Sequence, residues 1–165
     1  MSPGFSLHSI SRLLVVILLM LVTVSGTYYS MREQPRLVIV CDGRTAAVVD
    51  LSRGPVVVWY NWTHSVEGSI IAEKILASPH GLVLVEAWAK SFGAGHPYSS
   101  EEIGGSSFAF RDGYMVYGAN QSLGYELSIL AYEDYHGNIT LETNGLKTVV
   151  CPDFSRGTIM VLPHG

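Results

Sequence analysis

The stretch ITLETNGLKTVVC, residues 139–151, decides the fold class of this chain. Two short segments rich in β-branched residues flank Asn144-Gly145, a pair typical of type I′ hairpin turns because both central residues take positive φ. The same signal recurs at Asp42-Gly43 and at Asp112-Gly113. Beyond the N-terminal residues, no segment has a sustained helical period of apolar residues. We therefore predict an all-β domain, an antiparallel sandwich or small barrel of about ten strands.

The first and last of these turns also bear on the two cysteines. The first hairpin sets Cys41 opposite Arg44, and the last sets Cys151 opposite Asn138. Both cysteines then lie at strand ends, so a disulfide between them is geometrically reasonable in an oxidising compartment. The alternative is a pair of buried free thiols.

The composition is that of a folded domain with a sizeable core. The chain has 165 residues, of which 48% are apolar and 15% charged. The net charge is only −4, and no segment is rich in Lys and Arg. A nucleic-acid partner is therefore not expected.

The N-terminal residues differ from the rest. The run LLVVILLMLVTV, residues 13–24, is uncharged. Extended to Tyr29 it covers about 17 residues, near the lower limit for a membrane-spanning helix. Only Ser25 and Gly26 offer small residues for a cleavage site, which favours an uncleaved anchor over a cleaved signal. The predicted organisation is an N-terminal tail at 1–12, a transmembrane signal-anchor at 13–30, a tether at 31–36 and a β-domain at 37–165.

Three asparagines bear on the compartment of the β-domain. Asn61, Asn120 and Asn138 each begin a triplet that matches the glycosylation pattern. Together with the cysteines and the anchor, they favour an external domain. We expect a single-pass protein of the cell membrane, attached by the N-terminal helix, with the C-terminal domain outside the cytoplasm.

The central hairpin turns at Ser78-Pro79-His80-Gly81-Leu82. Pro79 suits the first central position of a type I turn, and Gly81 suits a left-handed residue that completes a three-residue loop with a bulge. This chemistry pairs Ser78 with Leu82. A two-residue turn would shift the pairing of the two strands by one residue.

The predicted register gives two carboxylates different surroundings. Glu86 faces Lys74, whereas Glu73 faces Ala87 on an apolar face, where a charge is costly unless it is paired. In the alternative register, Glu73 would lie directly opposite Glu86. His64 is the nearest candidate in sequence to pair with Glu73.

Motifs around this hairpin resemble those of a known family. They are HSVE at 64–67, Glu73, GLVLVE at 81–86, and SFGAG at 91–95 followed by Pro97. They resemble the signature of the "domain of unknown function 1850" family, over roughly residues 36–165. The resemblance implies a small extracytoplasmic β-domain that partners a tripartite (TRAP-type, TAXI class) solute transporter. It implies no settled biochemical activity.

The motif HSVE at 64–67 is compatible with two kinds of chemistry. Ser65 could act as a nucleophile with His64 as base, but adjacent residues of an extended chain point to opposite faces. His64 and Glu73, with His96 or Glu86, would suit a metal ion. The simpler interpretation is a hydrogen bond between His64 and Glu73. No cofactor other than such a metal ion is expected.

The glycine-rich motif is a candidate binding cleft. Gly93 and Gly95 would let a ligand or a partner backbone approach closely. Ring contacts would come from Trp88, Phe92, His96 and Tyr98. Here His96 stands where the resemblance leads us to expect an apolar residue before the proline. The alternative is a tight bend that leaves a strand, with Phe92 in the core.

The sequence therefore predicts a binding domain, rather than an enzyme, whose working surface lies within residues 61–97. Its partner would be the permease or the solute-binding protein of a TRAP/TAXI-type transport system. The alternatives are a metal-binding or enzymatic domain that uses His64 and Glu73, and a structural protein of the cell envelope. The predicted binding residues are His64, Ser65, Glu73, Phe92, Gly93, Gly95 and His96.

Overall fold

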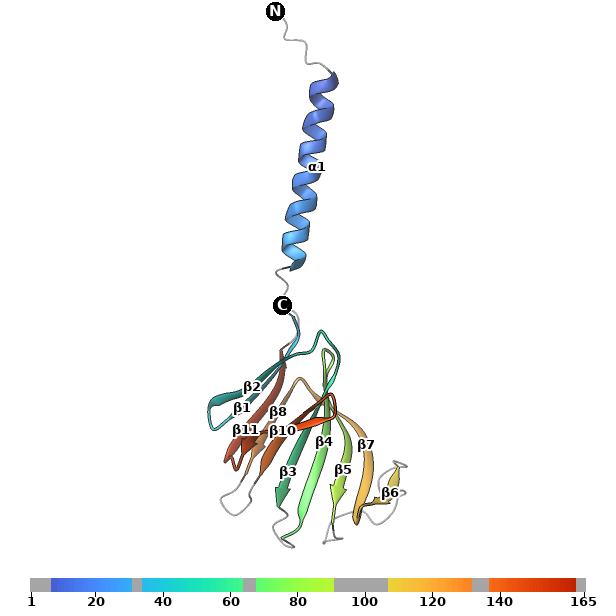
Figure 1. The fold of residues 1–165 in the computed structure, drawn as a ribbon, viewed down its shortest axis with the longest axis vertical. Helices are drawn as coiled ribbons and strands as arrows, with labels where there is room; N and C mark the ends of the chain where they lie inside the picture. Colours follow the sequence, from blue (N-terminus) through green and yellow to red (C-terminus); the bar gives the residue numbers. More distant parts are fainter. Residues whose placement is uncertain (1–6, 31–33, 64–67, 91–106, 132–136, 163–165) are drawn as a thin grey trace, which may run out of the picture. The chain divides into compact units, whose positions relative to one another are not determined.

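The described part of the chain contains one helix and a set of antiparallel strands (Figure 1). The computed structural model describes residues 7–30, 34–63, 68–90, 107–131 and 137–162. The helix α1 spans Leu7–Ser30. Over the described residues, no helix is sufficiently long and apolar to cross a membrane. This finding does not support the transmembrane anchor predicted at 13–30.

The β unit falls within Gln34–Pro163. Its described residues form the strands β1 (Arg36–Cys41), β2 (Arg44–Asp50), β3 (Val56–Thr63), β4 (Ile70–Ser78), β5 (Gly81–Ala89), β6 (Phe108–Arg111), β7 (Tyr114–Gly124), β8 (Glu126–Leu130), β9 (Asn138–Thr143), β10 (Leu146–Pro152) and β11 (Arg156–Leu162). One sheet has the order β2-β1-β11-β8, and the other has the order β10-β9-β3-β4-β5-β7-β6. The all-β antiparallel fold is confirmed, and it has two sheets.

The main core draws apolar side chains from both sheets. Leu37 and Ile39 of β1 and Ile159 of β11 come from the four-stranded sheet, and Val58 of β3 and Ile75 of β4 come from the seven-stranded sheet. All five are 0% exposed. Because side chains alternate along a strand, each sheet turns one face inward and leaves the other to solvent. Burial of each such side chain stabilises the fold by roughly 1.5–3 kcal/mol.

A disulfide joins the two sheets. Cys41 ends β1 in the four-stranded sheet, Cys151 lies on β10 in the seven-stranded sheet, and their Cα atoms are 6.2 Å apart. The predicted pairing of the cysteines is thereby confirmed. The predicted register around Cys151 is wrong, because a bulge after Val149 sets Cys151 opposite Ile139 rather than Asn138.

The predicted hairpin turns are present at all three positions. Asp42-Gly43, Asp112-Gly113 and Asn144-Gly145 have φ values from 48° to 78°. Positive φ at both central residues is the requirement of a type I′ turn. The three turns join β1 to β2, β6 to β7 and β9 to β10.

The turn of the central hairpin differs from the prediction. Ser78 pairs with Gly81, so the loop between them has two residues rather than three. A register shift between Lys74 and Ile75 then restores the predicted pairing of Lys74 with Glu86. The bulge that we expected in the turn lies instead within the strands. Glu73 still faces away from Glu86.

Candidate functional site

Most of the predicted site residues lie outside the described residues. They are His64, Ser65, Phe92, Gly93, Gly95 and His96. Their proximity to one another, and the predicted bond between His64 and Glu73, therefore stay predictions. Glu73 is the one member of the predicted set whose surroundings can be given.

Glu73 lies on the inward-facing side of β4. It is opposite Tyr60 of β3 and Ala87 of β5, and it shares its face with the buried Ile71 and Ile75. Burial raises the pKa of the Glu73 carboxyl, and a hydrogen bond with Trp62 acts in the opposite direction. A carboxyl of this kind holds its proton more readily than an exposed one.

Tyr60 responds to the same environment. Burial, and then the charge of Glu73, raise the pKa of Tyr60 to about 12. The phenol therefore stays neutral at physiological pH and can donate or accept a hydrogen bond. Tyr60 and Glu73 form a polar pair on an otherwise apolar sheet face.

The structure separates Glu86 from Glu73. Glu86 lies opposite Lys74, so its side chain is on the outer face of the seven-stranded sheet. Glu86 therefore does not belong with Glu73 in a metal site. Within the described ranges, no group of three or more His, Cys, Asp or Glu side chains could hold a metal ion.

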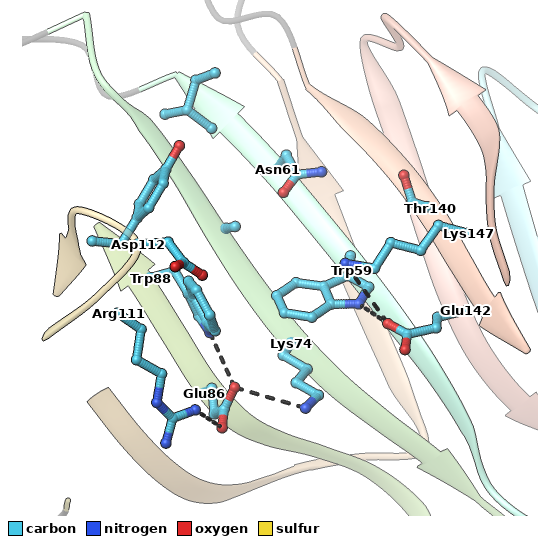
Figure 2. Close-up of a pocket in the computed structure, with 13 residues that line it drawn as sticks. Trp59, Asn61, Lys74, Glu86, Trp88, Arg111, Asp112, Thr140, Glu142 and Lys147 are labelled. Atoms are coloured by element: carbon cyan, nitrogen blue, oxygen red, sulfur yellow. Dashed lines mark hydrogen bonds and ion pairs between the residues drawn. The ribbon is translucent and has the colours of Figure 1, made fainter. Parts of the chain in front are cut away.

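A second candidate site lies on the outer face of the seven-stranded sheet (Figure 2). It is a groove of about 480 Å³, within the range of small-ligand sites. We call it the outer groove. Its lining residues are Trp59, Asn61, Ile70, Ala72, Lys74, Glu86, Trp88, Arg111, Asp112, Tyr114, Thr140, Glu142 and Lys147.

The register of the strands brings these residues together. Trp59 of β3 lies opposite Lys74 of β4 on one side and Thr140 of β9 on the other. Lys74 in turn lies opposite Glu86 of β5. Outward positions on adjacent strands thus form one row across the sheet, and long side chains from the row enclose the groove.

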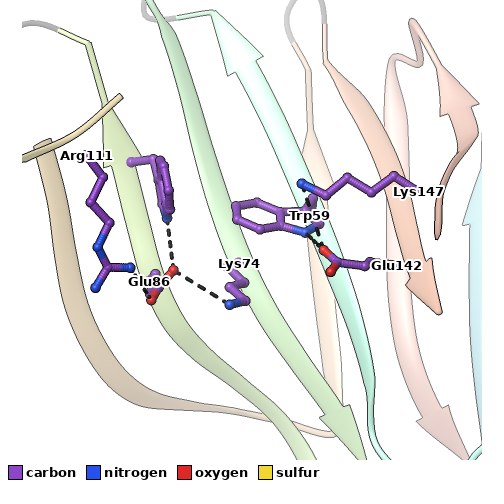
Figure 3. A network of polar contacts seen from close by, with 7 residues as sticks. Trp59, Lys74, Glu86, Arg111, Glu142 and Lys147 are labelled. Atoms are coloured by element: carbon purple, nitrogen blue, oxygen red, sulfur yellow. Dashed lines mark hydrogen bonds and ion pairs between the residues drawn. The ribbon is translucent and has the colours of Figure 1, made fainter. Parts of the chain in front are cut away.

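One half of the outer groove is built around Trp59 (Figure 3). The indole Nε1–H of Trp59 donates a hydrogen bond to Glu142 Oε2 at 2.6 Å. Lys147 Nζ is 3.8 Å from the same oxygen and 4.4 Å from the Trp59 ring centroid. The ammonium therefore contacts both a carboxylate and an aromatic face.

The other half is built around Trp88 in the same way. The indole Nε1–H of Trp88 donates to Glu86 Oε2 at 3.0 Å. Lys74 Nζ is 3.7 Å from Glu86 Oε2, and Arg111 Nη1 is 3.4 Å from Glu86 Oε1. Each half thus contains an indole whose N–H is bonded to a carboxylate, and each carboxylate has a cationic neighbour.

An aromatic row joins the two halves. The Trp59 and Trp88 ring centroids are 5.9 Å apart with an interplanar angle of 74°. The Trp88 and Tyr114 centroids are 6.1 Å apart. Edge-to-face contacts of this kind hold rings in a defined orientation. The row contributes aromatic surface to the groove.

The residues that line the outer groove offer several kinds of group for binding a ligand. Its described lining has no histidine, cysteine or serine. It offers aromatic surface, carboxylates and cations. Each of these groups fixes the orientation of a bound molecule.

The outer groove was not predicted from the sequence. The pair Lys74–Glu86 was predicted, but as an ordinary cross-strand contact. The available signal was Trp59 on the same face as Lys74, and Trp88 two positions from Glu86. Two tryptophans at outward positions of β3 and β5, on either side of β4, are unusual for a solvated face.

The comparisons with known proteins give one match. A family model described as "Domain of unknown function (DUF1850)" matches residues 58–148. The match covers more than half of the 165 residues and includes every lining residue of the outer groove. No curated protein and no solved structure matches the chain.

Proposed function

Because this chain belongs to the family described as a domain of unknown function, DUF1850, we propose that it is an accessory binding component of a solute transport system. The transport system would be of the TRAP/TAXI type that the family resemblance implies. In this proposal the domain acts outside the cytoplasm, next to the permease or the solute-binding protein. It holds a small molecule and does not transform it.

The outer groove is the observation that supports a binding role. Its size suits a small molecule, and it combines an aromatic row with fixed polar groups. The polar groups are positioned by their own contacts, since Glu86 and Glu142 each accept a bond from an indole. A site whose groups are already in place spends little free energy on ordering when a ligand binds.

The disulfide supports a location outside the cytoplasm. Disulfides persist in oxidising compartments and are rare where thiols are kept reduced. The bond between Cys41 and Cys151 joins the two sheets, so the domain is expected to reach its full stability only after export. Association with the cell membrane is a further part of the proposal and rests on the uncharged run within residues 13–30.

Co-purification from native membranes tests the accessory role. The tagged full-length chain would be lightly crosslinked, extracted in mild detergent and analysed by mass spectrometry, with an unrelated tagged exported protein as the control. Enrichment of a transporter permease or a solute-binding protein is the expected result. A chain that elutes alone, or with surface-layer proteins only, would overturn the transport role and favour a structural role in the envelope.

A second measurement tests the outer groove as the binding site. Small molecules released by denaturing the purified protein would be identified by mass spectrometry. We expect a compound that is released by the wild type and by Tyr125→Ala, but not by Trp88→Ala. Tyr125 is an exposed aromatic residue that does not line the groove, so it is the matched control. Equal release by all three proteins would remove the groove from the proposal.

The competing function is a metal-binding or enzymatic site that uses His64 and Glu73. The observation in its favour is the inward carboxyl of Glu73 with its raised pKa, because perturbed carboxyls gather at functional sites. Elemental analysis of the wild type and of Glu73→Gln decides this point. A bound metal that Glu73→Gln loses would favour this alternative over the accessory role.

A further inference from the structure

The charges of the outer groove balance one another. Among the described residues, three cationic side chains and three acidic ones line it. Lys74 and Arg111 lie within 4 Å of Glu86, and Lys147 lies within 4 Å of Glu142. An anionic ligand would have to separate these cations from their carboxylates, so the groove offers it little net attraction.

A cationic ligand is equally poorly suited to the groove. The Trp59 ring already has Lys147 Nζ at 4.4 Å and Lys74 Nζ at 5.6 Å from its centroid. A ligand ammonium would have to displace one of them from the ring. The balance of charge therefore selects a neutral ligand.

The arrangement of donors and acceptors narrows the class further. In each ion pair, the N–H donors lie less than 4 Å from a carboxylate acceptor. A hydroxyl is the neutral group that both donates and accepts, so one hydroxyl can bond to both members of such a pair. A ligand with several hydroxyls can do so in both halves of the groove.

The aromatic row supplies the complementary apolar contact. The indole N–H groups of Trp59 and Trp88 are bonded to Glu142 and Glu86, which leaves the carbon surfaces of the rings as their contribution to a ligand. Sugar rings are neutral, carry many hydroxyls and have flat patches of C–H bonds. These patches match an aromatic ring in shape and polarity.

We propose that the outer groove binds a neutral carbohydrate, with a C–H face of a sugar ring against Trp88 and its hydroxyls between Lys74, Glu86 and Arg111. The inference rests on the assignment of the groove as the binding site under the proposed function. It adds the chemical class of the ligand. The same balance of charge gives a charged solute, a nucleotide or an acidic peptide little net attraction.

An oligosaccharide array tests the class of ligand. The full-length protein would be applied to neutral gluco-, manno- and N-acetylglucosamine oligomers beside acidic oligosaccharides. The best neutral binder would then be titrated against tryptophan fluorescence. We expect affinity to fall at least about tenfold in Trp88→Ala and less in Trp88→Phe, which keeps a ring. Tyr125→Ala should bind like the wild type.

Salt dependence separates a neutral ligand from a charged one. Raising the salt from about 0.05 M to about 0.5 M should change the affinity less than about twofold, because screening acts on charged partners. A large loss of affinity at high salt would overturn the inference. Binding confined to acidic oligosaccharides would overturn it as well.

Protection of tryptophans from oxidation can be measured on the wild-type protein, so the result does not depend on whether a variant folds. Oxidation by N-bromosuccinimide, located by peptide mass spectrometry, should be slowed at Trp59 and Trp88 by the bound oligosaccharide. Trp62, which does not line the outer groove, is the internal control and should be unaffected. If no neutral oligosaccharide binds, the carbohydrate class is wrong. The accessory role would still be judged separately, by its co-purifying partner.

Discussion

Glu73 and Glu86 lie on neighbouring strands of one hairpin and have opposite environments. Glu86 is on the outer face, where Trp88, Lys74 and Arg111 all contact its carboxylate. Glu73 is on the inner face, where burial disfavours its charged form. The side-chain period of two along a strand produces this difference. Glu86 is therefore a hydrogen-bond acceptor held in position, whereas Glu73 is a carboxyl that retains its proton more readily.

The raised pKa of Glu73 makes the stability of the fold depend on pH. Below about pH 4.5, the usual pKa of a glutamate, the carboxyl is protonated in both the folded and the unfolded chain. As pH rises through the raised folded pKa, the folded protein must ionise a buried group, so this contribution to stability is lost. Glu73→Gln cannot ionise at this position. We expect the free energy of unfolding of the wild type to fall, relative to that of Glu73→Gln, as pH rises from 4.5 toward neutrality.

Urea unfolding of both proteins at a series of pH values measures this difference. The ionisation of all other groups is common to the two proteins and cancels. Parallel pH profiles would contradict the prediction, because they would mean that Glu73 titrates alike in the folded and unfolded chains. A neutral imidazole that donates a hydrogen bond to Glu73, or a cation beside it, would lower the pKa of Glu73. Either would produce parallel profiles only if it offset the rise in pKa caused by burial.

The indole hydrogen bonds of the outer groove are expected to contribute unequally to stability. Trp59→Phe keeps a ring but removes the 2.6 Å bond to Glu142, a charge-assisted bond that we expect to contribute about 1–2 kcal/mol. Trp88→Phe removes a 3.0 Å bond to Glu86, and Glu86 keeps two cationic neighbours. We expect the free energy of unfolding, from urea titration, to fall more in Trp59→Phe. The reverse order would show that the bond to Glu142 adds little.

At the scale of elements, local turn chemistry predicted three hairpins correctly. The Asp-Gly and Asn-Gly pairs have the positive φ values that a type I′ turn requires. The central hairpin was predicted one residue too long. Pro79 and Gly81 are compatible with two turn lengths. The shorter turn is the one present, together with a bulge after Lys74. Bulges also shifted the register near Cys151, and a turn motif carries no information about them.

Two turn glycines should differ in how they tolerate a side chain. Gly145 has φ +77° with open space around a built Cβ, whereas Gly81 has φ +113° and its Cβ would be 2.7 Å from the carbonyl oxygen of Gly124. Gly145→Ala therefore meets only the backbone penalty, about 1–2 kcal/mol. Gly81→Ala adds a collision with the neighbouring strand and should cost about 2–4 kcal/mol.

Thermal unfolding of the two alanine variants checks this ranking. Gly145→Ala is the matched control for Gly81→Ala, since both place alanine at positive φ in a hairpin turn. A larger loss of stability in Gly145→Ala would mean that the β4–β5 turn relaxes away from Gly124. The contact between Gly81 and β7 would then not be required for the sheet.

At the scale of the whole molecule, the order of the strands could not be predicted from the sequence. The hairpins are local, but β1 pairs with β11 and β3 pairs with β9, and no turn signal encodes those long-range pairings. The outer groove depends on the pairing of β3 with β9. Glu142 reaches Trp59 only because β9 lies beside β3. Local patterns could therefore locate the carboxylate at Glu73 and the outward tryptophans, but not the contact between Trp59 and Glu142 that completes one half of the outer groove.

The disulfide is a covalent cross-link between the two sheets, and its removal should affect the whole domain. Cys41 and Cys151 are 110 residues apart in sequence, so the bond restricts the unfolded chain strongly. Replacing both residues with alanine should lower the free energy of unfolding by about 2–5 kcal/mol. Wild-type protein unfolded in the presence of a reductant should lose a similar amount, whereas the double variant should not respond to the reductant. Urea unfolding of both proteins, with and without the reductant, measures this. Equal stability of wild type and double variant would show that packing between the sheets alone holds them together. Such a domain would fold as well in a reducing compartment as in an oxidising one, and the disulfide would then no longer support a location outside the cytoplasm.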